Sequence, residues 1–357
     1  MMKTLKNLNR IFRNIRKRIK LNYYCRHYDK SPTPRIKLQE VHSIALLRWD
    51  NKLGDTIMSG IFINALKTAR PDIEISVITP EFCSHWYKKS TQCHIVTCDK
   101  RSIKTARSFR NLKGKFDVVI ELGSSFDFKE LLAIHELGAQ YNIGYNKELH
   151  PIFNICLPKE ALHFKDRYLT AAKLFSDKVS EPSIPLIPFS NQNILISKDK
   201  VNVALNLFGS SKYRQFSKTE AIKFIIRWLK DFPNDVLYLI PVPDKISFLQ
   251  NLLKECNSER VILLTESASL EFSLQLLSQV DLCVTPDTSV VHMASALNTP
   301  TLAIYADDHQ NYQEWHPLSK QSQVLFNHPA HDKNDRIYVH EFHWSDLKAK
   351  REAMIFK

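Results

Sequence analysis

The segment 279-QVDLCVTPDTSVVHMASALNTPTLAIY-305 decides the fold of this chain. The apolar run VDLCV is typical of a buried strand, and the polar cluster TPDT ends it. A helical pattern that contains His292 follows at once, and a second apolar run, TLAIY, follows the helix. Such a unit is typical of a parallel α/β sheet, in which ligands bind at the carboxyl edge of the strands and anions favour helix N-termini. We therefore expect a ligand at this polar cluster.

Length and composition indicate a globular protein with two domains. The chain has 357 residues, more than one core usually supports, and its 44% hydrophobic content excludes a disordered chain. Its seven cysteines are scattered without a CxxC pair, which favours reduced thiols in a cytosolic protein over a disulfide or zinc framework. No apolar run approaches the roughly 20 residues of a membrane span, and the N-terminus lacks the apolar core of a signal peptide.

The positive charge is concentrated in an N-terminal arm. The net charge is +13, and residues 1–40, with twelve Lys or Arg and two acids, contribute +10 of it. Apolar residues recur in the arm at helical spacing: Leu5, Leu8, Ile11, Phe12, Ile15 and Ile19. Residues 1–30 therefore have three interpretations: a helix that lies on an anionic membrane surface, a nucleic-acid-binding helix, or a helix whose apolar stripe packs on the body.

Strands and helices alternate through both halves of the chain, which predicts mostly parallel, doubly wound sheets. Strands are expected at 41–49, 73–79, 94–98, 117–122, 141–145, 200–208, 236–242 and 261–265, and helices at 128–137, 157–175, 217–231, 247–256, 269–279 and 344–357. The Pro-rich segment 180–193 is the best linker candidate. We expect a basic arm at 1–40, Rossmann-like domains at 41–185 and 186–330 that face each other across a cleft, and a C-terminal tail at 331–357.

A first chemistry-bearing stretch is 46-LLRWDNKLGDTIMSGIFINALK-67. A strand ends, a loop with Lys52 follows, and Gly54 and Asp55 lead into a helix. Gly54 permits a tight turn or a close backbone approach. Asp55 has a structural interpretation, because acids are common at helix N-termini, and a functional one as a general base that projects into the cleft.

A second stretch is 204-ALNLFGSSKYRQFSKTEAIKF-224. Ser210 and Ser211 follow a strand, and small hydroxyls and backbone N–H groups at such a turn suit a phosphate. Lys212 and Arg214 supply positive charge, and Arg binds phosphate oxygens bidentately. The alternative is an ordinary polar turn. In the opening segment, likewise, Asp287 or Thr288 could cap the helix and His292 could be a hydrogen-bonded core residue.

Together these stretches resemble glycosyltransferase family 9, the ADP-heptose:lipopolysaccharide heptosyltransferases. The resemblance rests on KLGD, HFKDRYL, FGSSKYRQFS and VTPDTSVVHMASALNTPTLAIY, and it covers about residues 42–320. It implies an α/β protein of the GT-B fold, with an N-terminal acceptor domain, a C-terminal nucleotide-sugar domain and no bound metal or other cofactor. The absence of an Asp-x-Asp motif agrees with this.

The resemblance also implies roles for individual residues. Asp55 matches the proposed base, which takes the proton of the acceptor hydroxyl during an inverting displacement. Arg214 stands where the family usually has Lys and would offset charge on the leaving diphosphate. Residues that match the donor site are Ser210, Ser211, Asp287, Thr288, Ser289 and His292, with Asp244 as a looser match near the ribose or base. Lys52 and Gly54 match the loop on the acceptor side. Ser289 replaces the family's Gly, which leaves the donor sugar open.

The resemblance implies a transferase that moves heptose from ADP-heptose to the lipopolysaccharide core, and the similarity is closer to the outer-core members. A basic arm fits an enzyme that works at the cytoplasmic face of the inner membrane. The nearest alternative is an N-acetylglucosaminyltransferase that uses UDP-N-acetylglucosamine. An alternative from another class is a non-catalytic protein that binds through its basic arm.

Overall fold

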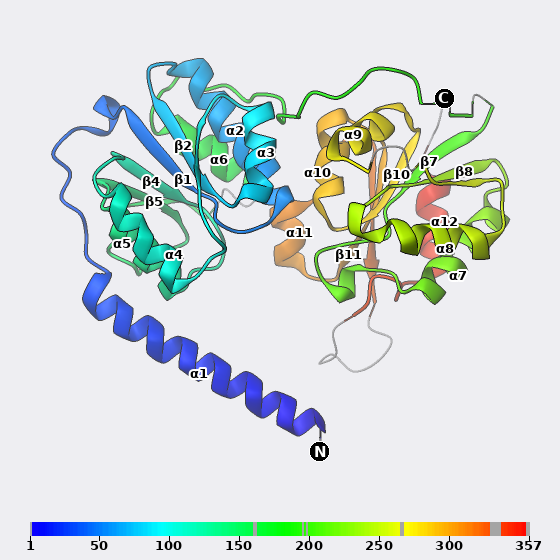
Figure 1. The fold of residues 1–357 in the computed structure, drawn as a ribbon, viewed down its shortest axis with the longest axis horizontal. Helices are drawn as coiled ribbons and strands as arrows, with labels where there is room; N and C mark the ends of the chain where they lie inside the picture. The colour runs from blue at the N-terminus through cyan, green and yellow to red at the C-terminus, as the bar shows by residue number, and fades with distance from the viewer. Residues whose placement is uncertain are drawn as a thin grey trace. The chain divides into compact units, whose positions relative to one another are not determined.

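The computed structural model describes residues 2–159, 163–194, 196–197, 199–264, 268–328 and 337–354, and among these the side chains of 2–11, 13 and 14 are not described. The chain divides into two compact units, Met1–Ser183 and Ile184–Lys357 (Figure 1). Each unit is an α/β layer structure with its own parallel sheet. Parts of three predicted segments lie outside the described residues. These are 160–162 of the helix expected at 157–175, residue 265 of the strand expected at 261–265, and 331–336 and 355–357 of the predicted tail.

Unit 1 contains a six-stranded parallel sheet in the order β3-β2-β1-β4-β5-β6. Its strands are β1 (Ser43–Leu47), β2 (Glu74–Thr79), β3 (His94–Thr97), β4 (Val118–Glu121), β5 (Tyr141–Tyr145) and β6 (Ile155–Leu157). Its helices are α1 (Met2–Tyr28), α2 (Leu53–Ala69), α3 (Glu81–Ser90), α4 (Ile103–Ser108), α5 (Phe128–Leu137) and α6 (Phe164–Lys173).

Unit 2 repeats this arrangement in the order β12-β11-β10-β7-β8-β9. Its strands are β7 (Val201–Leu205), β8 (Asp235–Leu239), β9 (Val261–Ile262), β10 (Leu282–Pro286), β11 (Thr301–Ala306) and β12 (Ser322–Asn327). Its α-helices are α7 (Lys218–Asp231), α8 (Ile246–Cys256), α9 (Leu270–Gln279), α10 (Ser289–Leu297), α11 (His309–Trp315) and α12 (Trp344–Glu352). Two 3₁₀ turns, η3 (Lys212–Arg214) and η4 (Pro243–Lys245), follow β7 and β8.

Both sheets have the same topology. Counted within its own unit, each runs in the order 3-2-1-4-5-6, the doubly wound order of dinucleotide-binding folds. The order reverses between β1 and β4 in unit 1 and between β7 and β10 in unit 2. Folds with this strand order bind ligands at the carboxyl ends of the strands beside such a switch point. The predicted pair of Rossmann-like sheets is therefore confirmed.

The sequence predicted most of the long elements and missed short ones. The predicted helix 128–137 coincides with α5, which the capping box of Asp127 and Glu130 begins and the left-handed Gly138 ends. The strands expected at 41–49 and 200–208 are shorter in the structure, where β1 ends at Leu47 and β7 ends at Leu205. The apolar residues beyond them are buried in loops instead. The strands β6 and β12 and the helices α3, α4 and α11 were not among the elements predicted with bounds.

The predicted tail helix forms and belongs to unit 2. Arg351 of α12 donates to both carboxylate oxygens of buried Asp235, at 2.7 and 3.2 Å, and Trp228 Nε1 donates to the same carboxylate at 3.0 Å. Breaking such a buried pair leaves an uncompensated charge and costs about 3–5 kcal/mol. These bonds fix α12 against the start of β8.

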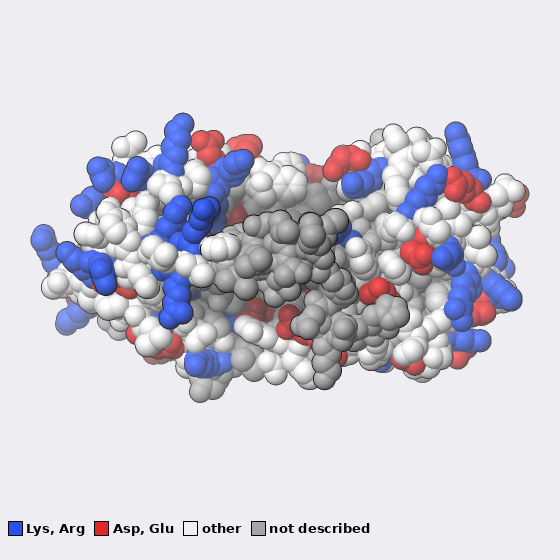
Figure 2. All heavy atoms as spheres, turned by 90° about the horizontal axis from the view of Figure 1, so that it is seen from below, with Lys and Arg blue, Asp and Glu red and all other residues white. Residues whose placement is uncertain are grey.

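The arm forms a single helix, α1, whose C-terminal end packs on unit 1. The rings of Tyr24 and Phe128 lie 5.1 Å apart, and those of Tyr28 and His135 lie 4.8 Å apart. The N-terminal part differs, since Phe12, Ile15 and Ile19 are 58%, 48% and 63% exposed. The interpretation in which the stripe packs on the body is therefore wrong for these three residues. On the face drawn in Figure 2, Lys and Arg side chains lie over both units, with Asp and Glu among them.

Candidate functional site

In unit 2, polar side chains from two loops meet at the switch point. Asn206, the first residue after β7, uses its Nδ2 to donate to Thr285 Oγ1 at 3.0 Å and to Thr288 Oγ1 at 3.2 Å. It also donates to the carbonyl of Phe208 at 3.0 Å, and its Oδ1 accepts from the N–H of Phe208. One buried amide thus joins the loop after β7 to the loop after β10. Both polar atoms of the Asn206 side chain are paired, so this amide holds the two loops together.

Gly209 lets these two loops come close together. A Cβ built on it would lie 2.7 Å from the Cβ and the carbonyl oxygen of Arg214 and 3.1 Å from Thr288 Cγ2. A side chain therefore cannot be added without displacing the backbone of the 209–214 loop. Gln215 Nε2 holds the same loop by donating to the Gly209 carbonyl at 2.7 Å.

Arg214 and Asp287 form an ion pair across the switch point. Arg214 Nη1 lies 3.2 Å from Asp287 Oδ2 and donates to the Asp287 carbonyl at 3.3 Å. Asn311 of α11 donates to the same carboxylate oxygen at 2.9 Å. The Arg214 side chain is 42% exposed whereas that of Asp287 is 9% exposed. The pair therefore presents a positioned guanidinium to solvent.

The helix after β10 begins at the predicted polar cluster. Thr288 is its N-cap, and Thr288 Oγ1 accepts from the N–H of Val290 at 3.2 Å, so the capping interpretation holds for this residue. Ser289 is the first residue of α10. The N-terminus of α10 faces the ligand edge with its partial positive charge.

His292 lies in the second turn of α10 and is buried. Burial lowers the pKa of His292 to about 4, with a further contribution from nearby His316, so its imidazole is neutral at pH 7. The ring packs against Trp315, with centroids 5.4 Å apart, and among the described residues its Nδ1 has no hydrogen-bond partner. An unpaired buried nitrogen beside the candidate site is a position where a ligand or a water could bond.

The remaining predicted donor residues lie at the same edge. Ser210 is exposed in the loop after β7, and Ser211 precedes the η3 turn, in which its carbonyl accepts from the N–H of Arg214 at 2.9 Å. Asp244 is exposed on η4, which follows β8, the neighbour of β7. Asp244 therefore lies at the carboxyl end of the strand beside β7, and its role stays a prediction.

In unit 1, a buried arginine follows β1 and binds two carboxylates. Arg48 Nη2 lies 2.7 Å from Asp55 Oδ1 and 2.9 and 3.1 Å from the two oxygens of Asp50. Arg48 and Asp55 are 5% and 8% exposed. Asp55 is the third residue of α2, so its side chain stands at the helix N-terminus on the switch-point edge.

The electrostatics of this cluster favour a base. Burial raises the pKa of Asp55 above its ordinary value, Arg48 opposes that rise, and the neighbouring charge of Asp50 adds to it. A carboxylate whose pKa is raised is a better proton acceptor than a solvated one. Lys52 is exposed and lies 4.0 Å from Asp50. Gly54 lies inside the first turn of α2 and its φ is not positive, so of its two interpretations the tight turn does not form there, and the close backbone approach stays a prediction.

The stretch HFKDRYL places two further residues at this edge. Arg167 Nη1 donates to Ser124 Oγ, in the loop after β4, at 2.8 Å. Its guanidinium also lies 3.7 Å from the ring centroid of Tyr145. The hydroxyl of Tyr168 is buried and has no hydrogen-bond partner in the described part of the chain, and burial raises its pKa to about 12.

Sequence reasoning missed several of these residues. Arg48 was counted as part of a buried strand, and Asn206 was passed over within an apolar run. Each interrupts an otherwise apolar strand end, which is the signal that could have found it. Asn311 offered no such signal, because it lies in the short helix α11, which was not predicted.

Part of unit 2 matches a known family. Residues 223–342, about a third of the chain, match glycosyltransferase family 9 (heptosyltransferase). This range includes Asp244, Asp287, Thr288, Ser289 and His292. The range begins after Asp55, Ser210, Ser211 and Arg214, so the roles predicted for these four residues rest on geometry and resemblance. No curated protein sequence matches the chain.

Solved structures share the fold over most of the chain. A glycosyl transferase of family 9 from Veillonella parvula is 15% identical, with a TM-score of 0.64, and the match covers 91% of this chain and 98% of that protein. The ADP-heptose lps heptosyltransferase II of E. coli is 18% identical, with a TM-score of 0.59 and coverages of 87% and 98%. The E. coli heptosyltransferase WaaC, solved with ADP, is 16% identical with the same TM-score and coverages. The fold is thus the predicted GT-B fold, and the family match supports a glycosyltransferase.

Proposed function

We propose that the chain is an inverting, metal-independent transferase that moves heptose from ADP-heptose to the lipopolysaccharide core. One observation carries the proposal. Arg214, Asp287 and the N-terminus of α10 meet at the switch point of unit 2, in which residues 223–342 match the heptosyltransferase family. A guanidinium beside a helix N-terminus is suited to a diphosphate, which is the part that nucleotide sugars share.

The diphosphate of the donor binds at this edge of unit 2. The Arg214 side chain is half exposed and is already oriented by Asp287. Its remaining guanidinium N–H groups can therefore donate to a phosphate oxygen. The hydroxyls of Ser210 and Ser211, on the same loop, add neutral donors. The close approach at Gly209 sets the distance between this loop and α10.

Asp55 acts as the general base. In the transfer, the acceptor hydroxyl oxygen attacks the anomeric carbon of the donor and gives its proton to the Asp55 carboxylate. The bond from that carbon to the diphosphate breaks as the new bond forms, which inverts the sugar. Arg214 and α10 neutralise the charge that develops on the diphosphate. Arg48 keeps the Asp55 carboxylate ionised and fixes its direction.

The arm brings the enzyme to its acceptor. Exposed Phe12, Ile15 and Ile19 lie on a helix that also carries exposed Arg16 and Lys17. A helix with apolar and basic faces binds in the plane of an anionic membrane. We place the enzyme at the cytoplasmic face of the inner membrane, where the lipid-held acceptor is made. No helix in the described part of the chain is both long and apolar enough for a membrane span.

Donor binding measured by calorimetry tests the proposal most directly. ADP-heptose and UDP-N-acetylglucosamine are titrated at matched concentrations without added metal. Binding of ADP-heptose alone is the expected result. Binding of the UDP sugar alone would keep the mechanism and overturn the donor. Binding of neither, in the presence and absence of acceptor, would favour a non-catalytic protein that binds through its basic arm.

The variant Asp55→Asn tests the catalytic step. We expect transfer to slow by about 100-fold or more while the affinity for donor is unchanged, because the amide cannot accept the proton. The measurement is the initial rate of sugar transfer to purified core acceptor, together with donor calorimetry on the same preparation. An unchanged rate would remove Asp55 from the mechanism.

A further inference from the structure

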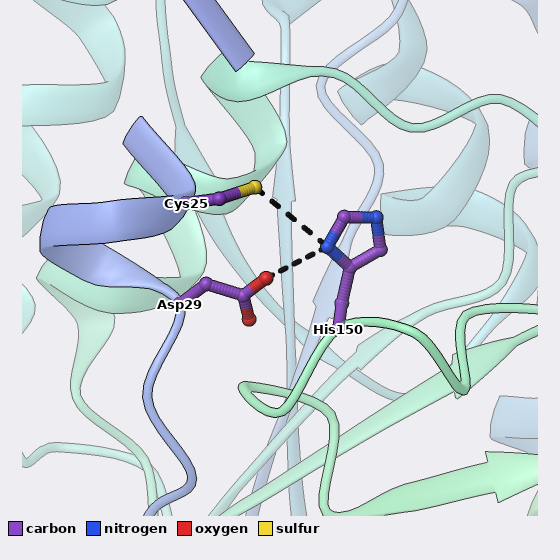
Figure 3. Close-up of side chains that lie close together, drawn as sticks. All are labelled: Cys25, Asp29 and His150. Atoms are coloured by element: carbon purple, nitrogen blue, oxygen red, sulfur yellow. Dashed lines mark hydrogen bonds and ion pairs between the residues drawn. The ribbon is translucent and has the colours of Figure 1, made fainter. Parts of the chain in front are cut away.

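Three potential metal ligands converge where the arm joins unit 1. Cys25 lies in the last turn of α1, Asp29 directly follows the helix and its N–H donates to the Cys25 carbonyl, and His150 comes from the loop between β5 and β6 (Figure 3). Cys25 Sγ lies 3.9 Å from His150 Nδ1, and Asp29 Oδ2 lies 2.8 Å from the same nitrogen. The three donor atoms all lie within 4.8 Å of one another. No other such group exists among the described residues.

We propose that Cys25, Asp29 and His150 form a zinc-binding site that fastens the end of α1 to the loop between β5 and β6 in the body of unit 1. Thiolate, imidazole and carboxylate are the ligands zinc prefers, and a mixed set with sulfur favours zinc over magnesium or calcium. The charges also match, because one thiolate and one carboxylate balance a divalent cation while the imidazole stays neutral. A fourth position is left for water.

The distances need little adjustment. With usual zinc–ligand bond lengths and a tetrahedral angle, nitrogen and sulfur are ~3.6 Å apart and nitrogen and oxygen ~3.4 Å apart. The observed separations of 3.9 and 2.8 Å bracket these values, so shifts of well under about 1 Å bring the ligands into place. Without a metal, one ring nitrogen faces both a thiol and a carboxylate and can make only one good hydrogen bond.

The surroundings already orient the ligands. Asp29 Oδ1 accepts from the N–H of Ile152 at 2.9 Å, which leaves Oδ2 for the metal. The His150 ring packs against Phe126, with centroids 4.6 Å apart. The Asp29 and His150 side chains are 6% and 21% exposed, so the site is shielded and still reachable by an ion. When zinc binds, the Cys25 thiol gives its proton to solvent and the Cys25 sulfur forms the bond to zinc.

The test uses the full, tag-free chain after dialysis against a chelator. Zinc is titrated by calorimetry, and bound zinc is counted by atomic emission. The same chain is loaded with Co²⁺, whose near-ultraviolet spectrum shows a charge-transfer band only if a thiolate binds it. We expect one zinc per chain and the thiolate band. Absence of binding by the unaltered chain, or binding without the thiolate band, would overturn the proposal.

Matched variants separate this site from stray binding. Cys25→Ser and Asp29→Asn keep the side-chain shapes and should weaken zinc binding by at least about 100-fold, since even outer-shell partners of a metal contribute 10–100-fold. Cys98→Ser is the control, because Cys98 is half-buried against the same core cluster as Cys25. If Cys98→Ser removes the zinc, or Cys25→Ser does not, the assignment is wrong.

Proteolysis reports the structural consequence. Zinc should slow tryptic cleavage after Arg26 and Lys30, which flank the ligands, in the unaltered chain and in Cys98→Ser. It should give no protection in Cys25→Ser. Melting temperatures of the metal-free variants establish that each one folds. Protection of Cys25→Ser equal to that of the unaltered chain would contradict the proposal.

Discussion

At the scale of single residues, one guanidinium shared by two carboxylates sets the electrostatics around Asp55, the proposed base. Arg48 is bound to Asp50 on one side and to Asp55 on the other, and all three charges lie at the carboxyl edge of β1. Arg48 lowers the pKa of Asp55, whereas burial and Asp50 raise it. Removing the Asp50 carboxylate should therefore lower the pKa of Asp55.

The variant Asp50→Asn should shift the acid limb of the pH–rate profile to lower pH. Without the Asp50 charge the pKa of Asp55 falls, so the base stays ionised further into the acid range. The profile of kcat/KM against pH measures this. Asp72→Asn is the matched control, because Arg70 and Asp72 form the same type of Arg–Asp pair on the exposed surface. An acid limb that moves upward, or moves equally in both variants, would contradict the role given to Asp50.

Buried His292 should make the protein less stable in acid. Its pKa is about 4 when folded, against about 6.5 when unfolded, so the unfolded state binds a proton over this range and the native state does not. Stability is therefore retained above pH 6.5 and is lost as the pH falls towards 4, by on the order of 3 kcal/mol. Urea unfolding at pH 7 and pH 5 should show a smaller pH dependence for His292→Gln. Equal dependence in both proteins would show that another group is responsible.

At the scale of elements, α1 has two parts that differ in their contacts with the rest of unit 1. Its end, from Tyr24 to Tyr28, packs on α5 and belongs to the body. Its earlier turns expose apolar and basic side chains. A deletion of residues 1–30 would therefore remove the core contacts of Tyr24 and Tyr28 as well as the exposed turns of α1. A deletion of residues 1–19 is the cleaner experiment, because it also keeps Lys20, whose Nζ lies 5.6 Å from the centre of the Phe128 ring.

The variant Ile19→Gln should weaken membrane binding. Ile19 is 63% exposed on the apolar stripe of α1, and an inserted isoleucine contributes about 1.5–3 kcal/mol, or roughly tenfold or more in partitioning. Sedimentation with anionic vesicles at physiological salt measures the effect. Ile226→Gln is the control, since Ile226 is a 53% exposed isoleucine of α7 in unit 2. Unchanged sedimentation of Ile19→Gln would argue against a membrane role of the arm.

At the scale of the whole molecule, the proposed functions are divided between the two units. Unit 1 contains Asp55 and the arm, and unit 2 contains the complete set of candidate donor residues. Each unit has a buried sheet of its own. In unit 2, the Arg351–Asp235 pair attaches α12 to that sheet, so this helix of the predicted tail packs as part of unit 2.

Residues 184–357 expressed alone should bind the donor nucleotide. All proposed diphosphate contacts lie in this unit, so its affinity for ADP should be within about tenfold of the intact chain, while residues 1–183 should not bind. Calorimetry on the two fragments measures this, after circular dichroism has established that each fragment folds. A folded 184–357 fragment without affinity for ADP would place donor contacts in unit 1.

The sequence by itself determined the class of fold and the position of its chemistry. Alternating apolar runs and helical patterns specify parallel strands, and polar residues directly after those runs fall at the carboxyl edge of any such sheet. Asp55, Arg214, Asp287 and Thr288 could be selected in this way because each signal lies within a few residues of its own strand. The amphipathic arm could be predicted for the same reason, since its pattern is local.

Only the tertiary structure decided which of these residues meet. Asn206 and Thr288 are 82 positions apart and Asp29 and His150 are 121 positions apart, and nothing local in the sequence pairs them. Such pairs depend on strand order and register, which put β7 beside β10 and the end of α1 beside the loop after β5. The exposure of the arm's apolar stripe was decided in the same way. A helical period shows that one face is apolar, and only the packing of the whole unit shows whether that face is covered.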